Sequence, residues 1–189
     1  EKPKTYFIAE VELNKNYAVI ISTSGGLWRY IIGDTIKFTD TKPYRFVITG
    51  RIKSFINVFG EELMVDNADR AISMTCEKTG ALAQEYSAAP VFMEGKIKGC
   101  HEWLVEFSKE PDSIENFTRI LDESLQSLNS DYEAKRYKNM TLNQLRVIKA
   151  RTNLFSDWLA SKNKLGGQNK IPRLSNTREN FEEMLSLNR

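Results

Sequence analysis

The sequence predicts an α+β protein made of two parts: the C-terminal end of a β-barrel subdomain, and then a small mixed-sheet α/β domain. Three observations support this prediction. Short strand-like runs separated by Gly and Pro fill the first fifty residues. Beyond Gly50, helical and strand-like patterns alternate. The first part is too short for a complete barrel, so we expect residues 1–52 to be the last strands of an N-terminal domain and residues 53–189 to form a C-terminal domain.

In the first part, strand-like runs of four to eight residues are bounded by turn residues. The first two runs flank the turn at residues 14–16, and we expect them to pair as a hairpin. Gly-Gly, Gly-Asp and Lys-Pro pairs separate the later ones. The predicted strands are residues 6–13, 17–23, 28–31, 35–38 and 44–48.

The second part alternates helices and strands. Asp66 is a candidate cap for a helix that ends at Gly80, and Asp112 is expected to start a second helix with apolar residues at helical spacing. We expect the helices to cover one face of a small mixed sheet. The other predicted helices are residues 131–137, 154–159 and 177–187, and the predicted strands are residues 54–58, 83–92, 102–107 and 144–149.

The composition narrows the class of protein. Hydrophobic residues make up 41% and charged residues 28%, which is typical of a soluble globular protein. The 27 basic and 25 acidic residues lack the basic excess of a dedicated nucleic-acid-binding protein. Cys76 and Cys100 form no CxxC pair, so we expect two small buried thiols and neither a disulfide framework nor a metal site. No apolar run approaches the ~18 residues of a membrane helix. We therefore expect a cytoplasmic protein with no nucleic-acid and no membrane partner.

Two residue pairs in the first part have chemistry suited to a nucleotide. Gly33 and Asp34 follow an apolar stretch, and a carboxylate on a tight glycine turn can accept hydrogen bonds from the vicinal hydroxyls of a ribose. A plain turn explains the pair equally well. Arg51 follows Gly50 at the change of pattern, and its planar guanidinium can bind a ribose or phosphate oxygen. The alternative for Arg51 is a solvated charge after a strand.

Lys170 lies in the most informative segment, residues 165–173. Gly166 and Gly167 allow a loop that can fold over a ligand, because glycine adopts backbone angles that other residues avoid. Pro172 prevents a helix from absorbing the segment. The pattern indicates one ammonium group on a loop that can move but whose ends are limited by the glycines and by Pro172. The alternative is a surface lysine in a flexible tail.

Three segments together resemble a known family. They are GLWRYIIGD at residues 26–34, FVITGR at residues 46–51 and QNKIPR at residues 168–173. In order and spacing they resemble motifs of the auxin-responsive-promoter family of acyl acid–amido synthetases, part of the adenylate-forming superfamily. The resemblance covers nearly the whole chain but only the family's C-terminal third, and residues 60–63, 85–90 and 129–136 are more similar to bacterial members. It implies that the second part is a lid domain and that a longer portion precedes Glu1.

The resemblance also implies an activity and roles for residues. ATP would activate a carboxylic acid as an acyl-adenylate, with Mg²⁺ as the second cofactor, and the amine of an amino acid would then attack to give an amide. Asp34, supported by Gly33, would hold the ribose hydroxyls, and Arg51 would approach the same sugar. Lys170 would reach the α-phosphate, where a cation lessens the repulsion between two anions in the transition state. Lys53 would be the hinge about which the lid turns against the N-terminal domain of its own chain.

Two departures from the superfamily pattern affect these expectations. The Ser-Gly pair that usually precedes the lysine is absent, which favours amide over thioester formation by analogy. A Ser/Thr/Gly-rich phosphate loop is also absent, so we expect this chain to be inactive by itself. An acyl-CoA-type ligase remains an alternative. So does a non-catalytic lobe that binds a partner or RNA through basic residues, namely Lys96, Lys98, Arg146, Lys149 and Arg151.

His101 is the only histidine and is followed by Glu102. Such a pair suggests a general base, but neighbouring strand residues point to opposite faces. We therefore expect a structural or surface role for His101. The three tryptophans are expected to be core residues: Trp28, Trp103 and Trp158.

Overall fold

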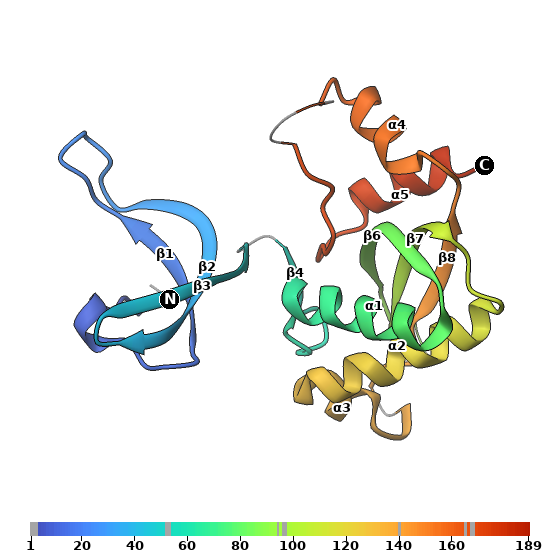
Figure 1. Ribbon diagram of the computed structural model, residues 1–189, viewed down its shortest axis with the longest axis horizontal. Helices are drawn as coiled ribbons and strands as arrows, with labels where there is room; N and C mark the ends of the chain where they lie inside the picture. The colour runs from blue at the N-terminus through green and yellow to red at the C-terminus, as the bar shows by residue number, and fades with distance from the viewer. Residues whose placement is uncertain are drawn as a thin grey trace. The chain divides into compact units, whose positions relative to one another are not determined.

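The computed structural model describes residues 4–51, 54–93, 95, 98–139, 141–164, 166 and 169–189 (Figure 1). The chain divides into two compact units, Glu1–Lys53 and Ser54–Arg189. Each unit has its own β-strand pairing and its own buried side chains.

The first unit is a three-stranded antiparallel sheet in the order β1-β2-β3. Its strands are β1 (Asn16–Ile21), β2 (Tyr30–Thr41) and β3 (Tyr44–Arg51). Tyr17 is paired with Ile36 across β1 and β2, and Phe38 with Phe46 across β2 and β3. The strands predicted at residues 35–38 and at the end of 28–31 are therefore parts of one continuous strand.

The strand predicted at residues 6–13 is wrong. This segment contains a short 3₁₀ helix, η1 (Ile8–Glu10), and the partner of β1 is β2. Side chains satisfy backbone groups that a ladder would otherwise use. The Phe7 N–H donates to Glu10 Oε2 at 2.7 Å, and the Glu12 N–H donates to the Tyr17 hydroxyl at 2.9 Å. Apolar composition alone did not reveal these local bonds.

The core of the first unit is a small aromatic cluster around Phe38. The ring of Phe38 makes edge-to-face contacts with Tyr17, Tyr44 and Phe46, with centroids 5.9–6.2 Å apart. Phe38 is buried, but the prediction that Trp28 is a core residue is wrong, since Trp28 is 81% exposed. A three-stranded sheet without a second layer cannot bury all of its apolar side chains.

The second unit is built on a mixed three-stranded sheet in the order β6-β7-β8. Its strands are β6 (Leu82–Val91), β7 (Cys100–Lys109) and β8 (Arg146–Ala150). β6 and β7 run antiparallel, whereas β7 and β8 run parallel, with Trp103 paired to Val147. A two-stranded sheet, β4 (Phe55–Ile56) and β5 (Leu63–Met64), precedes it. This mixed α/β architecture confirms the predicted fold class.

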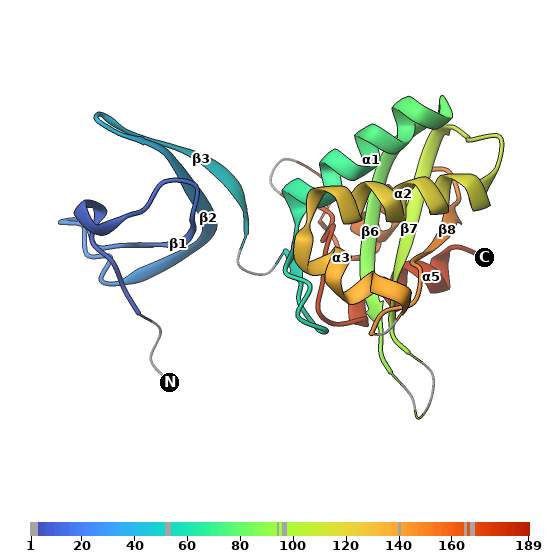
Figure 2. The same ribbon diagram turned by 90° about the horizontal axis from the view of Figure 1, so that it is seen from below.

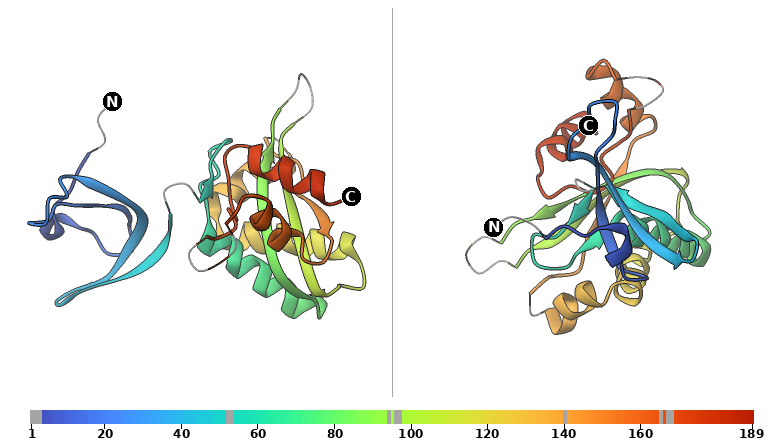
Figure 3. Two further views of the ribbon diagram at one scale, coloured as in Figure 1. Left: turned by 90° about the horizontal axis from the view of Figure 1, so that it is seen from above. Right: turned by 90° about the vertical axis from the view of Figure 1, so that its left-hand side faces the viewer.

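Helices cover both faces of the β6-β7-β8 sheet, so the prediction of helices on one face is wrong. Figure 2 shows α1 (Val65–Thr79) and α2 (Ile114–Leu128) across one face, and the left view of Figure 3 shows α4 (Leu154–Ser161) and α5 (Glu179–Leu187) across the other. The physical reason lies in β7. Trp103 and Val105 belong to one buried cluster and Leu104 to the other, so this strand is apolar on both sides.

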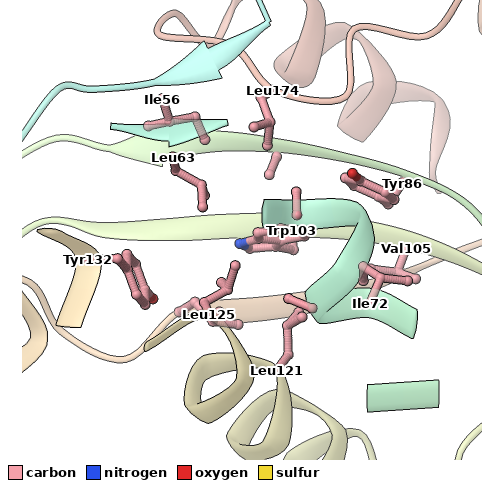
Figure 4. Close-up of a cluster of buried hydrophobic side chains, with 14 of the residues drawn as sticks. Ile56, Leu63, Ile72, Tyr86, Trp103, Val105, Leu121, Leu125, Tyr132 and Leu174 are labelled. Carbon is pink, nitrogen blue, oxygen red and sulfur yellow. The ribbon is translucent and has the colours of Figure 1, made fainter. Parts of the chain in front are cut away.

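Trp103 is at the centre of the larger cluster (Figure 4). Its side chain is fully buried and stacks on Tyr86 of β6, with ring centroids 5.4 Å apart. Leu121 and Leu125 of α2 pack against it from the helical layer. Trp158 is buried in the second cluster, so the predictions of buried tryptophans at residues 103 and 158 are confirmed. Cys100 is buried as predicted, whereas Cys76 is only partly buried.

Local capping explains where two of the helices begin and end. Gly80 ends α1 in the left-handed region, with φ 68°, and its N–H donates to the Cys76 carbonyl at 2.8 Å, as the sequence predicts. At the start of α2 the cap is Ser113 rather than Asp112, because the Ser113 hydroxyl accepts the Asn116 N–H at 3.1 Å. Asp66 lies in the first turn of α1 and is not its cap. α3 (Ser130–Arg136) and the short η2 (Tyr137–Asn139) follow α2.

Candidate functional site

Strand pairing brings two of the predicted nucleotide-binding residues together. Gly33 lies in β2 with φ 92°, a conformation that favours glycine, and Asp34 follows it as a half-buried residue. The register of the β2–β3 pair places Asp34 opposite Arg51. Beside them the Thr49 and Thr35 hydroxyls lie 3.1 Å apart. The sheet therefore places the backbones of Asp34 and Arg51 opposite each other. That the two residues bind one sugar stays a prediction.

The remaining predicted site residues are placed differently. Lys53 lies outside the described residues, so its proposed hinge role has no structural description. Lys170 belongs to the second unit and its side chain is exposed. Among the described residues, nothing forms a hydrogen bond or ion pair with the Lys170 ammonium. That Lys170 reaches the sugar site of the first unit stays a prediction.

The residues that follow Lys170 are docked along the edge of β6. The Ser87 hydroxyl donates to the Pro172 carbonyl at 2.8 Å, and the Ala88 N–H donates to the Arg173 carbonyl at 2.7 Å. Leu174 forms a parallel bridge with Ala88, and its side chain is fully buried in the core (Figure 4). We call residues 172–174 the anchor, because their backbone and the Leu174 side chain are held against β6. Lys170 lies two residues before it.

Arg173 adds an electrostatic contact to this anchor. Its Nη1 lies 3.0 Å from Asp69 Oδ1 of α1, and its Nε lies 2.8 Å from Glu85 Oε1 of β6. The guanidinium also lies over the ring of Tyr86, 5.2 Å from the centroid. The Tyr86 hydroxyl donates to Asp69 at 2.5 Å, consistent with the pKa of Tyr86, which burial and the hydrogen bond to Asp69 raise above its usual value. We call these four side chains the Arg173 cluster.

A cleft of about 280 Å³ lies next to the lysine segment, and Ile171 forms part of its wall. Glu85 and Glu106 also line it, together with Asn153 and Phe155 at the start of α4. Glu106 is buried, and its Oε1 accepts the Asn153 N–H at 2.7 Å. This carboxylate therefore serves the amino-terminal end of α4, where partial positive charge stabilises an anion.

His101 has a structural role, as the sequence predicts, but its partner lies far along the chain. Its Nε2 lies 2.8 Å from Glu61 Oε1, and both side chains are fully buried. Glu102 instead pairs with Arg178 at 2.7 Å. Because Glu61 Oε2 also accepts the Phe59 N–H at 2.7 Å, the pair fixes the loop between β4 and β5 against β7.

The Glu61 carboxylate should make the second unit less stable as the pH falls. Burial acts to raise the pKa of Glu61, but the hydrogen bond and charge of His101 and the Phe59 N–H together lower it below its usual 4.5. A carboxyl whose pKa is lowered on folding stabilises the fold above its unfolded pKa, and this contribution is lost as the pH falls through the folded pKa. We expect Glu61→Gln to reduce stability near neutral pH and to flatten the loss of stability below about pH 4.5.

Thermal unfolding followed by circular dichroism across that pH range measures this effect. Glu62→Gln, at the exposed neighbouring carboxylate, is the matched control and should follow the wild-type curve. Parallel curves for Glu61→Gln and the wild type would contradict the assignment.

The basic residues of the alternative binding lobe are partly engaged within the chain. Lys149 Nζ lies 2.6 Å from Glu110, and Arg151 Nη1 lies 2.7 Å from Asp157. Lys96 lies outside the described residues. Acidic partners lower the positive potential that a nucleic acid would need, so the arrangement gives this alternative little support.

The described residues also bear on metal binding and on membrane insertion. Within them, no group of three or more His, Cys, Asp or Glu side chains could hold a metal ion. No helix in the described part of the chain has the length and apolar character needed to cross a membrane.

The fold places the chain in a class of proteins. A solved structure of GH3.15 acyl acid amido synthetase matches 96% of this chain and 35% of its own length, with a TM-score of 0.73 and 19% identity. A solved structure of 2-hydroxyisobutyryl-CoA ligase in the postadenylation state matches 93% of this chain and 35% of its own length, with a TM-score of 0.52 and 16% identity. The chain therefore has the fold of about a third of each of these two enzymes.

The sequence matches two family models, one in each part of the chain. Residues 66–179 match the GH3 family C-terminal domain, and residues 1–51 match the GH3 family central domain. The chain belongs to the GH3 family. The resemblance drawn from the three sequence motifs is thereby confirmed.

Named relatives come from Arabidopsis thaliana. The chain is 26% identical over 186 residues to indole-3-acetic acid-amido synthetase GH3.3, and 25% identical over 185 residues to probable indole-3-acetic acid-amido synthetase GH3.1. Each match covers 92% of this chain and 31% of the relative. The chain thus spans about a third of the length of these relatives.

Proposed function

We propose that the chain forms the C-terminal portion of an ATP-dependent acyl acid–amido synthetase. The observation that carries this proposal is the match of both GH3 domain models, in order, to the two parts of the chain. In the first step a carboxylate oxygen attacks the α-phosphorus of ATP, the bond to the β-phosphate oxygen breaks, and pyrophosphate leaves. In the second, the nitrogen of an amino acid attacks the acyl carbon and loses a proton, and AMP leaves.

Four residues of the chain have roles in this proposal. Asp34, which follows Gly33 within β2, holds the ribose hydroxyls, and Arg51 on the paired strand approaches the same sugar. Lys170 contacts the α-phosphate and the attacking carboxylate oxygen. Two observations support this role. The Lys170 ammonium is exposed and can contact a ligand, and the hydrogen-bonded residues that follow it limit how far it can move.

The proposal includes a domain boundary and a motion. Residues 1–52 are the last strands of the N-terminal domain, and residues 53–189 form the lid, which turns about Lys53 between the two chemical steps. The compact units on either side of this boundary support it. Mg²⁺ accompanies ATP and offsets the charge of its phosphates. We place the enzyme in the cytoplasm as a bacterial-type member.

The direct test uses the full-length protein. Pyrophosphate release is measured over a panel of carboxylic acids with ATP, and products are identified by mass spectrometry after addition of amino acids or CoA. We expect acid-dependent pyrophosphate release and an amide with an amino acid. A thioester formed with CoA, and no amide, would establish the acyl-CoA ligase instead. No acid-dependent pyrophosphate release with any acid would reject adenylation.

A further inference from the structure

We propose that Arg173 is the positioning residue for Lys170, because it occupies two carboxylates that would otherwise capture the lysine. The inference rests on the proposed function for its catalytic consequence. The structural part of the proposal concerns only the second unit. Because Arg173 occupies Asp69 and Glu85, the Lys170 ammonium does not form an ion pair with them.

Chain geometry limits where Lys170 can go. Arg173 and Lys170 are three residues apart, so their Cα atoms are separated by at most about 11 Å. Between them, Pro172 is bonded to β6 through its carbonyl and Ile171 lies against the wall of the cleft that Glu85 also lines. A lysine has a flexible four-carbon stem, and its ammonium can therefore search the surface near Glu85 and Asp69.

The charges around the anchor explain why an arginine is needed there. Asp69 and Glu85 come from different elements, α1 and β6, and their carboxylates converge on one guanidinium. With Arg173 in place both carboxylates have a cation, and within the described residues neither contacts Lys170. Without Arg173, two adjacent negative charges would attract the nearest free cation. Among the described residues, Lys170 is a free cation on the same segment.

The Arg173 cluster contributes more to the orientation of the Arg173 guanidinium than to the stability of the fold. The side chains of Arg173 and Asp69 are 38% and 44% exposed, and ion pairs at such exposure contribute little to stability. The anchor is held independently by its backbone hydrogen bonds and by the buried Leu174. A guanidinium fixed by two carboxylates and a ring has few orientations left, because its donors form a rigid fork.

The first measurement is independent of enzyme activity. The rate at which an amine-reactive ester labels Lys170 is followed by peptide mass spectrometry in the full-length protein. We expect Arg173→Ala to slow this labelling several-fold, since an ion pair favours the unreactive ammonium. Adding Asp69→Asn and Glu85→Gln to Arg173→Ala should restore it. Unchanged labelling in Arg173→Ala, or no recovery in the triple variant, would overturn the proposal.

The second measurement follows adenylation. Arg173→Ala is expected to lower kcat for pyrophosphate release up to about 5-fold, the most that ion pairs at this exposure would withhold from catalysis, with little change in the KM for ATP. Arg173→Lys keeps the positive charge but not the planar guanidinium, so its kcat should lie between those of the wild type and Arg173→Ala. In a Lys170→Ala background, Arg173→Ala should cause no further loss. An additional loss there would show that Arg173 acts independently of Lys170 and would reject the positioning role.

Arg178 supplies a matched control. Its guanidinium also has two carboxylate partners, Glu102 at 2.7 Å and Glu182 at 2.6 Å, and lies 5.0 Å from the centroid of the Phe181 ring. Arg178→Ala removes similar contacts without touching the anchor, so Lys170 labelling and kcat should stay at wild-type values. The labelling result decides the positioning role even if the wild-type protein releases no pyrophosphate, an outcome that would reject the proposed function alone.

Discussion

Replacing Lys170 by alanine is expected to slow adenylation by about 10²–10³-fold, or roughly 3–4 kcal/mol of transition-state stabilisation. The carboxylate and the α-phosphate are both anions, and charge increases around the phosphorus as they approach. A lysine ammonium placed there by the anchored segment offsets this repulsion only when the bond is forming. The loss should therefore fall on kcat, and the KM for ATP should change little.

The measurement is the rate of acid-dependent pyrophosphate release by the full-length protein in the absence of amine. Lys164→Ala is the matched control, because Lys164 is another exposed lysine six residues earlier in the chain. It should retain the wild-type rate. If Lys170→Ala adenylates at wild-type speed, the assigned role of this lysine is wrong, whatever the overall reaction proves to be.

Replacing Asp122 by alanine is expected to destabilise the second unit by about 3–5 kcal/mol. Asp122 is buried in α2, and Arg136 of α3 donates to both of its oxygens at 2.8–3.1 Å. The Tyr132 hydroxyl donates to Oδ1 at 2.7 Å, in keeping with burial and the nearby Asp122 charge, which raise the pKa of Tyr132. Removing the carboxylate takes the Asp122 charge away from a nearly buried guanidinium, which keeps its hydrogen bond to the Leu142 carbonyl.

Urea unfolding followed at 222 nm measures this loss, since the α-helices of the described residues all lie in the second unit. Glu123→Ala is the control on the same helix. Glu123 forms an exposed ion pair with Arg119 at 2.6 Å, and its loss should cost only about 0.3–0.5 kcal/mol. Asp122→Asn should fall between the two. Equal midpoints for Asp122→Ala and Glu123→Ala would show that the buried pair contributes no more than a surface pair.

The fold was predictable wherever short-range patterns dominate. Helical spacing identified α2, and the glycine at position 80 identified the end of α1. Strands β6 and β7 were predicted close to their observed bounds. The segment at residues 6–13 was mispredicted because its backbone groups bond to Glu10 and Tyr17 side chains, which periodicity does not reveal.

The candidate site shows the same division. The motifs identified Asp34, Arg51 and Lys170 as residues with nucleotide chemistry, and strand register then placed Asp34 opposite Arg51. The sequence offered Glu102 as the neighbour of His101, whereas the buried partner is Glu61, forty positions away. The contacts of Arg173 were also missed, although the residue closes the QNKIPR motif, because Asp69 lies 104 positions earlier.

By itself the sequence determined most helices and strands of the second unit, the family motifs and the presence of one lysine near a pair of glycines. These features depend on residues close together in the chain, where backbone preferences and capping act directly. Only the tertiary structure decided that helices cover both faces of the second sheet, which carboxylates hold Arg173, and which side chains surround Trp103. These outcomes depend on packing between distant segments, because burying an apolar face specifies that it must be covered but not what covers it.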